Sequence, residues 1–232
     1  MDQGELKALI GDTGLNQCRV NGDLFCIPNN WPEYVPNGVM YREDLRAKYN
    51  LPKPDTIENM EAFFLGIQKN MPKQPILRVT TSESQGMSQA FDAASVLNYK
   101  YPWVTVNGMP YGLDCNYNTP SQVGEYWYDQ KFVDDCNLLK KWADYGFWSK
   151  SALSDTNDSE AFLNGLCVAL VAGQNPNKQI TARNELAKTH PDWQCEYIAY
   201  GETTGIMYPG HATQNGTAIV RGSKNPERAM MV

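Results

Sequence analysis

Short apolar runs of strand length alternate with segments of helical periodicity along most of this chain. Residues 166–172 form the longest apolar run, residues 193–200 alternate as a strand, and a helix is expected over about 178–188. A further helix is expected over about 56–70, capped by Asp55 or Thr56. Strands separated by helices predict an α/β fold, with a mixed sheet covered by helices on both faces.

Three other elements follow from local signals. Residues 4–10 resemble a helix end before a loop from Gly11 to Gly14, and a hairpin is expected over about 17–27 around Asn21-Gly22. A long helix is expected over about 123–145. Gly146 would end that helix. Its predicted inward face consists of Phe132, Cys136, Leu139 and Trp142.

Composition excludes several classes of protein. The net charge of the 232 residues is −6 and acidic and basic residues are interspersed, so we expect no nucleic-acid partner. No run approaches the roughly 20 apolar residues of a membrane span, and the first residues lack the features of a secretory leader. The 13 Tyr and 6 Trp suit a polar ligand that also has flat apolar faces.

The six cysteines do not predict a metal site. No CxxC motif occurs and neither His190 nor His211 lies near a cysteine, so we expect no metal and no cofactor. Cys18 and Cys26 flank the Asn21-Gly22 turn and could face each other across the hairpin. The alternative is that the cysteines are free buried thiols, because Cys is also a small apolar side chain.

The motifs of common enzymes are missing from the sequence. It contains no GxSxG, HExxH, P-loop or dinucleotide-binding fingerprint. Acidic pairs such as Asp134-Asp135 are expected on helix surfaces, and His190 at a helix end. We therefore expect a protein that is not an enzyme. The alternative is a glycoside-acting domain that uses Glu33 or Asp114 in the aromatic loops.

Aromatic and amide side chains recur instead in four loops that follow strands. Stacking rings and Asn or Gln amides are what a sugar requires, because its apolar face lies on a ring and its hydroxyls need donors and acceptors. Ligands of open α/β sheets bind outside the carboxyl ends of strands. The candidate ligand-binding residues in these loops are Trp31, Tyr34, Trp103, Gln174, Asn175, Tyr208 and His211.

Each candidate has a structural alternative. Trp31 and Tyr34 lie in a Pro-braced loop and could instead pack between lobes. Gln174 and Asn175 precede a helix, where capping is an equal interpretation. A lone loop His such as His211 is more often a hydrogen-bonding residue than a catalyst.

Four segments, in order, resemble the extracellular solute-binding proteins of carbohydrate ABC importers, particularly the lipoprotein branch of Gram-positive bacteria. The first is NGDLFCIPNN, which is similar to a strand of that family that ends in Ile-Pro. The most specific is VMYREDLRAKYNLPKPDTIENMEAFFLGIQKNMP, with its Tyr-Arg-x-Asp-Leu and Pro-x-Thr-helix pattern. The others are LLKKWADYGFWSKSAL with SEAFLNGLCVALVAG, and VRGSKNPERAM.

This resemblance implies a periplasmic-binding-protein-like (type II) fold, in which two lobes close on a ligand in the cleft between them. Residues 1–40 would be a remnant of the first lobe and the crossing segment, residues 41–205 the second lobe, and residues 206–232 the return crossing with the start of a first-lobe helix. Tyr41 would lie at the first crossing, as a ligand-binding or a structural residue.

The resemblance also implies partners and a location. The full-length protein would bind a small solute, most simply a saccharide, outside the cytoplasm, and pass it to ABC permease subunits. It would be held at the cell surface by an upstream lipid anchor, and a sensor role is the alternative to import. Because SKNPERAMMV reads as a helix that stops after its first turn, we expect this chain to be an internal fragment.

Overall fold

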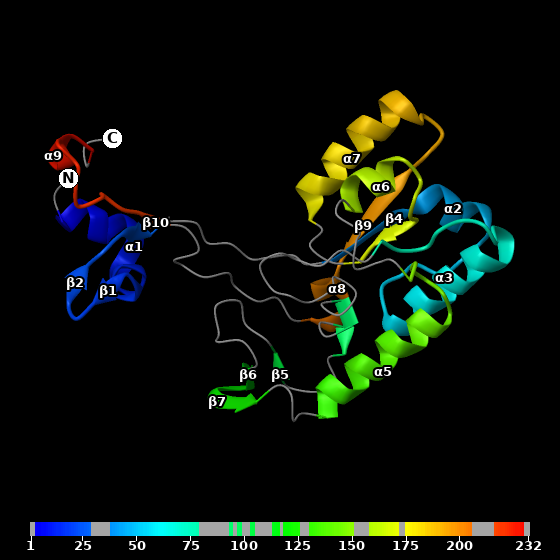
Figure 1. The fold of residues 1–232 in the computed structure, drawn as a ribbon, viewed down its shortest axis with the longest axis horizontal. Coiled ribbons are helices and arrows are strands. Elements are labelled where there is room, and N and C mark those ends of the chain that lie inside the picture. The colour runs from blue at the N-terminus through cyan, green and yellow to red at the C-terminus, as the bar shows by residue number, and fades with distance from the viewer. Residues whose placement is uncertain are drawn as a thin grey trace. The chain divides into compact units, whose positions relative to one another are not determined.

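The computed structural model divides the chain into two compact units, residues 1–35 with 208–232 (unit 1) and residues 36–207 (unit 2). Figure 1 shows the elements of both units. The residues that the structure describes are 3–28, 38–78, 93–94, 97–98, 103–104, 113–116, 118–125, 130–150, 158–171, 175–205 and 216–229.

Unit 1 is built from short elements at the two ends of the chain. Helix α1 (Gln3–Gln17) is broken at Gly11, where φ is 77°, and continues as a second helical segment instead of the predicted loop. It is followed by the hairpin β1 (Arg19–Val20) and β2 (Asp23–Leu24), and by β3 (Ile27–Pro28). Strand β3 pairs antiparallel with β10 (Gly216–Thr217), and α9 (Pro226–Ala229) lies near the carboxyl end.

The predicted hairpin of unit 1 is confirmed. Asn21 and Gly22 both have positive φ, 54° and 92°, as a two-residue turn of this kind requires. The turn joins Val20 to Asp23, which are paired in the β1–β2 ladder.

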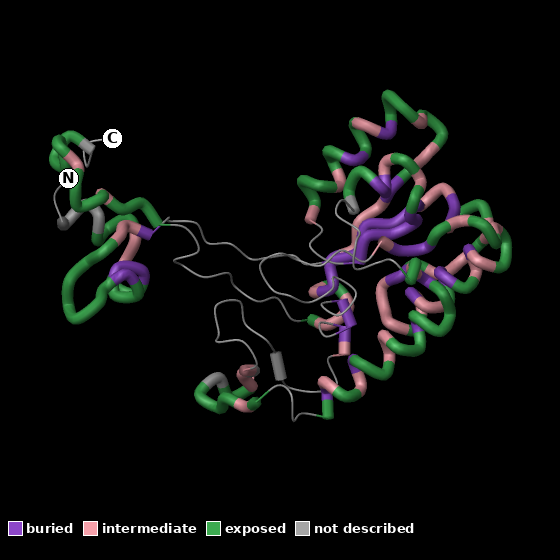
Figure 2. The backbone as a smooth tube through the Cα atoms, in the orientation of Figure 1, coloured by how far each residue is buried: buried purple, intermediate pink, exposed green. Residues whose placement is uncertain are grey.

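Unit 2 contains a three-stranded sheet in the order β8 (Ala169–Leu170), β4 (Gly38–Arg42), β9 (Cys195–Ala199). Strand β4 is antiparallel to both neighbours, and Leu77 adds a parallel bridge to Ala169. All five residues of β4 are buried, and Figure 2 shows the buried residues concentrated on these strands. Val39 and Tyr41 face one side of the sheet, while Met40 belongs to the core on the other side.

Helices cover both faces of this sheet. Met60, Phe63, Phe64 and Ile67 of α3 (Ile57–Asn70) and Trp142 of α5 (Gln130–Asp144) pack in the core that contains Val39 and Tyr41. Helices α6 (Asp158–Leu163) and α7 (Pro176–Thr189) pack against Met40 and Leu170 through Phe162 and Leu186. The expected α/β class with a mixed sheet between helices is confirmed. The short helices α2 (Glu43–Lys48) and α8 (Tyr200–Thr204) follow β4 and β9 directly.

The start of α5 and part of its buried face were predicted wrongly. Leu139 and Trp142 face the core as expected, but Cys136 does not. Residues 123–125, expected as the start of the helix, belong instead to strand β7 (Thr119–Glu125), which pairs with β6 (Leu113–Asn116). Strand β6 pairs in turn with β5 (Trp103–Val104). On α5, Lys131 and Asp135 are buried while Cys136 is exposed. The apolar pattern could not predict this face, because a buried Lys–Asp ion pair takes the place of apolar residues.

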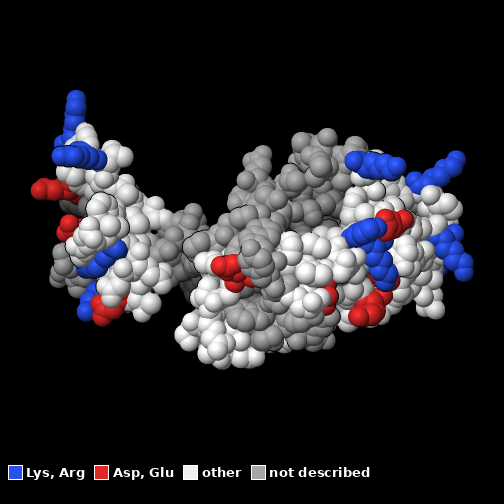
Figure 3. All heavy atoms as spheres, turned by 60° about the horizontal axis from the view of Figure 1, so that its bottom comes forward, with Lys and Arg blue, Asp and Glu red and all other residues white. Residues whose placement is uncertain are grey.

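None of the helices that the structure describes has the length and hydrophobicity needed to cross a bilayer. On the molecular face drawn in Figure 3, acidic and basic residues are interspersed over the described surface.

Candidate functional site

The strands of unit 2 bring several chain segments to one end of the sheet. Gly38, the first residue of β4, pairs with Ala199, the last residue of β9. Strand β8 runs parallel to β9, since both are antiparallel to β4, so its carboxyl end at Val171 points the same way. We call the part of the sheet formed by Gly38, Val171 and Ala199 the Gly38 end.

Three of the predicted binding segments are connected in sequence to described residues at or near the Gly38 end. Residues 29–37 lead into Gly38, residues 172–174 follow Val171, and residues 206–215 follow α8, which itself follows Ala199 directly. In unit 1, the described residues that flank two of these segments, Pro28 and Gly216, pair with each other. Ligands of α/β sheets bind outside the carboxyl ends of strands, so this end is the candidate site.

Close packing at the Gly38 end explains the glycine. A Cβ on residue 38 would lie 2.2 Å from the carbonyl oxygen of Ile198 and 2.6 Å from a ring carbon of Tyr197. The Tyr197 ring therefore lies against the backbone of Gly38. A backbone oxygen cannot move aside as a flexible side chain can, so only glycine fits the start of β4.

Two polar residues at this end were missed by the sequence analysis. Tyr197 is half-buried, and burial, followed by the charge of Glu202, raises the pKa of its phenol to about 12. Glu202 is exposed on α8. A partly exposed ring beside a carboxylate could both stack on and hydrogen-bond a sugar. The only available signal was the place of Tyr197 near the end of an alternating strand.

Tyr200 fixes the start of α8 to the neighbouring strand. Its side chain is fully buried, and its hydroxyl donates a hydrogen bond to the carbonyl oxygen of Val171. On the same helix, the Thr203 hydroxyl donates to the carbonyl oxygen of Asp55 at 2.7 Å. These two bonds hold the segment from which residues 206–215 depart.

Tyr41 lies away from this site. It is three residues along β4 from Gly38, about 10 Å at the usual rise of a strand. Its side chain is 1% exposed and packs edge-on against Phe63, with the ring centres 5.9 Å apart. Burial and the hydrogen bond to Glu43 raise the pKa of the Tyr41 phenol. Of its two predicted roles, the structural one fits this position, because almost none of its surface is available to a ligand.

Asn175 caps the start of α7, which was the alternative to its ligand-binding role in the sequence prediction. Its side-chain oxygen accepts a hydrogen bond of 2.9 Å from the backbone N–H of Lys178, and Pro176 occupies the first turn of α7. It is four residues beyond Val171, so at most about 14 Å separates their Cα atoms. Asn175 thus adjoins the Gly38 end, but its side-chain oxygen is already engaged.

The remaining candidates are not tested by the structure. Trp103 lies in β5 opposite Asn116, and its side chain is outside the described residues. The others are also outside them: Trp31, Tyr34, Gln174, Tyr208 and His211, together with Glu33 of the enzyme alternative. Among the described residues, no group of three or more His, Cys, Asp and Glu side chains could hold a metal ion.

Comparison with known proteins gives a consistent fold. No family model and no curated protein sequence matches the chain. Among solved structures, the alginate-binding protein AlgQ2 superposes with a TM-score of 0.66 at 17% identity, over 98% of this chain and 46% of that protein. An N-glycan transport solute-binding protein from Streptococcus pneumoniae gives 0.55 at 17% identity, over 99% and 49%.

The GacH receptor of Streptomyces glaucescens gives a TM-score of 0.54 at 12% identity, over 95% of this chain and 50% of that protein. The chain thus spans about half the length of the structures it matches. At these identities the likeness concerns the fold. The resemblance inferred from four sequence segments is confirmed at that level: the chain has the fold of the solute-binding proteins of ABC transporters.

Proposed function

We propose that this chain is part of the substrate-binding component of an ABC importer that binds a carbohydrate or a similar polar solute. The observation that carries the proposal is the solute-binding-protein fold over almost the whole chain. These neighbours are an alginate-binding protein, an N-glycan transport protein and a receptor solved with acarbose, and all three ligands are saccharides. A saccharide also suits the aromatic and amide residues of the candidate loops.

The proposed lobes follow the sequence prediction. Residues 1–40 and 206–232 would belong to the first lobe and the two crossings, and residues 41–205 to the second lobe. The ligand would lie in the cleft between the lobes, against Trp31 and Tyr34 from one crossing and Tyr208 and His211 from the other. Both crossings are connected in sequence to described residues at or near the Gly38 end, where Tyr197 and Glu202 are added as candidate contacts.

The proposal extends to partners and location. Import requires ABC permease subunits, which would recognise the form closed around the ligand. The protein would work outside the cytoplasm, held at the membrane by an upstream lipid anchor. A receptor fed by the same binding protein would give a sensor instead, with the same ligand chemistry.

A ligand screen tests the proposal. The probes are alginate oligosaccharides, N-glycan oligosaccharides, β-1,6-galactobiose and acarbose, added to this chain and to the full-length protein while the melting temperature is recorded. We expect at least one saccharide to raise the melting temperature. A rise in the full-length protein alone would mean that the ligand needs both walls of the cleft. No rise in either protein would overturn the proposal.

Two variants then locate the site and test for catalysis. Trp31→Ala should abolish the shift, because a stacking ring is lost. Tyr145→Ala, which removes an exposed aromatic ring directly after α5, should keep it. An unchanged shift in Trp31→Ala would refute the stacking role. Products from the oligosaccharide that disappear in Glu33→Gln would support the glycoside-acting alternative.

A further inference from the structure

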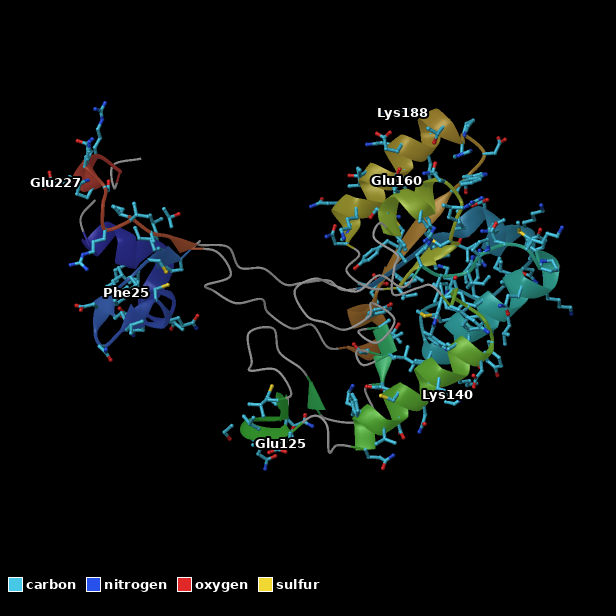
Figure 4. The ribbon with its side chains drawn as sticks, in the orientation of Figure 1. Phe25, Glu125, Lys140, Glu160, Lys188 and Glu227 are labelled. Carbon is cyan, nitrogen blue, oxygen red and sulfur yellow. The ribbon has the colours of Figure 1, made fainter. Side chains whose placement is uncertain are left out.

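The hairpin of unit 1 holds two cysteine side chains together. Backbone pairing continues one step beyond the β1–β2 ladder, where the N–H of Phe25 donates to the carbonyl oxygen of Cys18 at 3.0 Å. Cys26 follows immediately, and its thiol hydrogen-bonds with that of Cys18. Phe25, the residue before Cys26, is labelled in Figure 4.

The surroundings fix both residues of the pair. Cys18 is buried at the end of α1, where its N–H donates to the carbonyl oxygen of Leu15 at 3.1 Å. The Cys26 sulfur lies against β10, since a Cβ on Gly216 would lie only 2.9 Å from it. The positive φ of Asn21 and Gly22 and a 2.8 Å hydrogen bond from Arg19 to the carbonyl oxygen of Gly22 define the turn between them. The two thiols are therefore neighbours because of a tightly specified turn.

We propose that Cys18 and Cys26 form an intramolecular disulfide that closes the hairpin when a disulfide oxidant such as oxidised glutathione is present. Residues 27–28, which form β3, follow Cys26 directly. The bond would thus tie the end of α1 to the strand from which residues 29–37 depart. The inference does not depend on the proposed ligand.

The chemistry is two successive thiol–disulfide exchanges. Cys26 is the half-buried thiol and hence the one that an oxidant reaches first. Its thiolate attacks one sulfur of oxidised glutathione, forms a mixed disulfide and releases one glutathione thiol. The Cys18 thiolate then attacks the Cys26 sulfur and releases the second glutathione thiol. The protein loses two protons and two electrons, and the oxidant becomes two molecules of glutathione.

The second exchange should be the slow one. Burial is the main cause that raises the pKa of the Cys18 thiol, and it persists when Cys26 carries glutathione, so little Cys18 thiolate is present near neutral pH. Below that pKa the thiolate fraction rises about tenfold with each pH unit. We expect a mixed disulfide on Cys26 to accumulate at pH 7 and to convert into the Cys18–Cys26 bond faster at pH 9.

Tryptic digestion reads out the bond directly. Cleavage after Lys7, Arg19 and Arg42 places Cys18 in peptide 8–19 and Cys26 in peptide 20–42, with no other cysteine in either. After oxidation of the folded chain, a digest without reductant should contain these two peptides covalently linked, and reduction should separate them. The thiols of Cys18 and Cys26 should both be lost to alkylation.

Variants make the test specific. Cys26→Ser should abolish both the mixed disulfide and the linked peptide, and Cys18→Ser should leave the mixed disulfide unresolved. Cys136→Ser, which removes an exposed thiol on α5, should change neither. The proposal is overturned if both thiols of the oxidised chain remain alkylatable, if the mixed disulfide never resolves at pH 9, or if the bond joins other cysteines.

Discussion

The guanidinium carbon of Arg42 lies 3.6 Å from the centre of the Trp193 ring. The same guanidinium donates two hydrogen bonds, of 2.7 and 2.6 Å, to the carboxylate of Asp44. Trp193 stacks in turn on His190, with ring centres 4.0 Å apart and planes 11° apart. Arg42 is the last residue of β4, at the opposite end of the strand from Gly38, and is only 5% exposed. The Trp193 ring and the Asp44 carboxylate together compensate the cost of burying its charge.

Replacing Arg42 by Lys should weaken unit 2 although the charge is kept. An ammonium lacks the planar fork that bonds Asp44 twice and stacks on Trp193, so we expect a loss of about 1–3 kcal/mol in the free energy of unfolding. Urea denaturation measures it. Arg183→Lys, in a pair with Glu196 whose side chains are 50% and 41% exposed, should cost less than about 1 kcal/mol. Equal losses in the two variants would refute the role of the stack.

Helix α5 carries a matched pair of ion pairs. Lys131–Asp135 and Lys140–Asp144 have the same residue types at the same spacing, with N–O distances of 2.8 and 2.6 Å. The side chains of the first pair are 2% and 0% exposed, and those of the second 73% and 64%. Asn98 also donates to Asp135 at 2.7 Å, yet burial outweighs both partners and raises the pKa of the Asp135 carboxyl.

Lys131→Met should therefore destabilise unit 2 by about 3 kcal/mol, because it leaves a buried carboxylate without its cation. Lys140 is labelled in Figure 4. Lys140→Met should change the free energy of unfolding by less than about 1 kcal/mol, because this ion pair is exposed. Thermal or urea denaturation compares the two variants. Similar small losses of stability in Lys131→Met and Lys140→Met would contradict the predicted cost of leaving the buried Asp135 carboxylate without its cation.

Gly38→Ala should destabilise unit 2 through a clash at the start of β4. A methyl group 2.2 Å from the Ile198 carbonyl oxygen forces the strands apart, at a cost of about 1–3 kcal/mol. Gly222→Ala is the control, because a Cβ there meets nothing within 4 Å. Hydrogen exchange of the β4 and β9 amides locates the effect, and unchanged protection in Gly38→Ala would count against the close approach.

The acid stability of unit 2 should depend on Glu43. The Arg46 guanidinium bonds both of its carboxylate oxygens at 2.7 Å and lowers the pKa of that carboxyl below the usual 4.5. A lowered pKa in the folded state means that the stabilisation is present above pH 4.5 and is lost as the pH falls through the lower value. Glu43→Gln should therefore flatten the fall in stability below pH 4.5.

The control for this prediction is Glu185→Gln. Glu185 pairs with Lys188 at 2.8 Å, with side chains 46% and 68% exposed, so its replacement should leave the acid side of the stability curve unchanged. Melting temperatures between pH 3 and 7 provide the measurement. If the melting temperature of Glu43→Gln fell with pH in parallel to that of the unmodified chain, the Glu43–Arg46 pair would not be the source of the acid sensitivity.

Tyr41→Phe separates a structural tyrosine from a ligand-binding one. Losing the hydroxyl that bonds Glu43 in the core should cost about 1 kcal/mol of stability, while the response to a bound saccharide stays the same. The melting temperature with and without ligand gives both quantities. If Tyr41→Phe abolished the ligand response and left stability unchanged, Tyr41 would be a ligand-binding residue and not a structural one.

Local signals in the sequence were sufficient where the structure is decided by neighbouring residues. Thr56 caps α3 by accepting from the N–H of Asn59 at 3.1 Å, as the sequence predicted. The Asn21-Gly22 turn and the start of α7 were also predictable, because a cap or a two-residue turn is formed within a few residues of the chain. The alternation of apolar runs and helices predicted the α/β class in the same way.

Tertiary structure decided the rest. Only strand pairing could show that β8 and β9 end beside the start of β4, and hence that the described residues leading to three predicted segments lie at or near one end of the sheet. Only packing could show that Tyr41 is covered by α3 and that α5 buries Lys131 and Asp135. These outcomes depend on contacts between residues far apart in the chain, whose energies no local pattern contains.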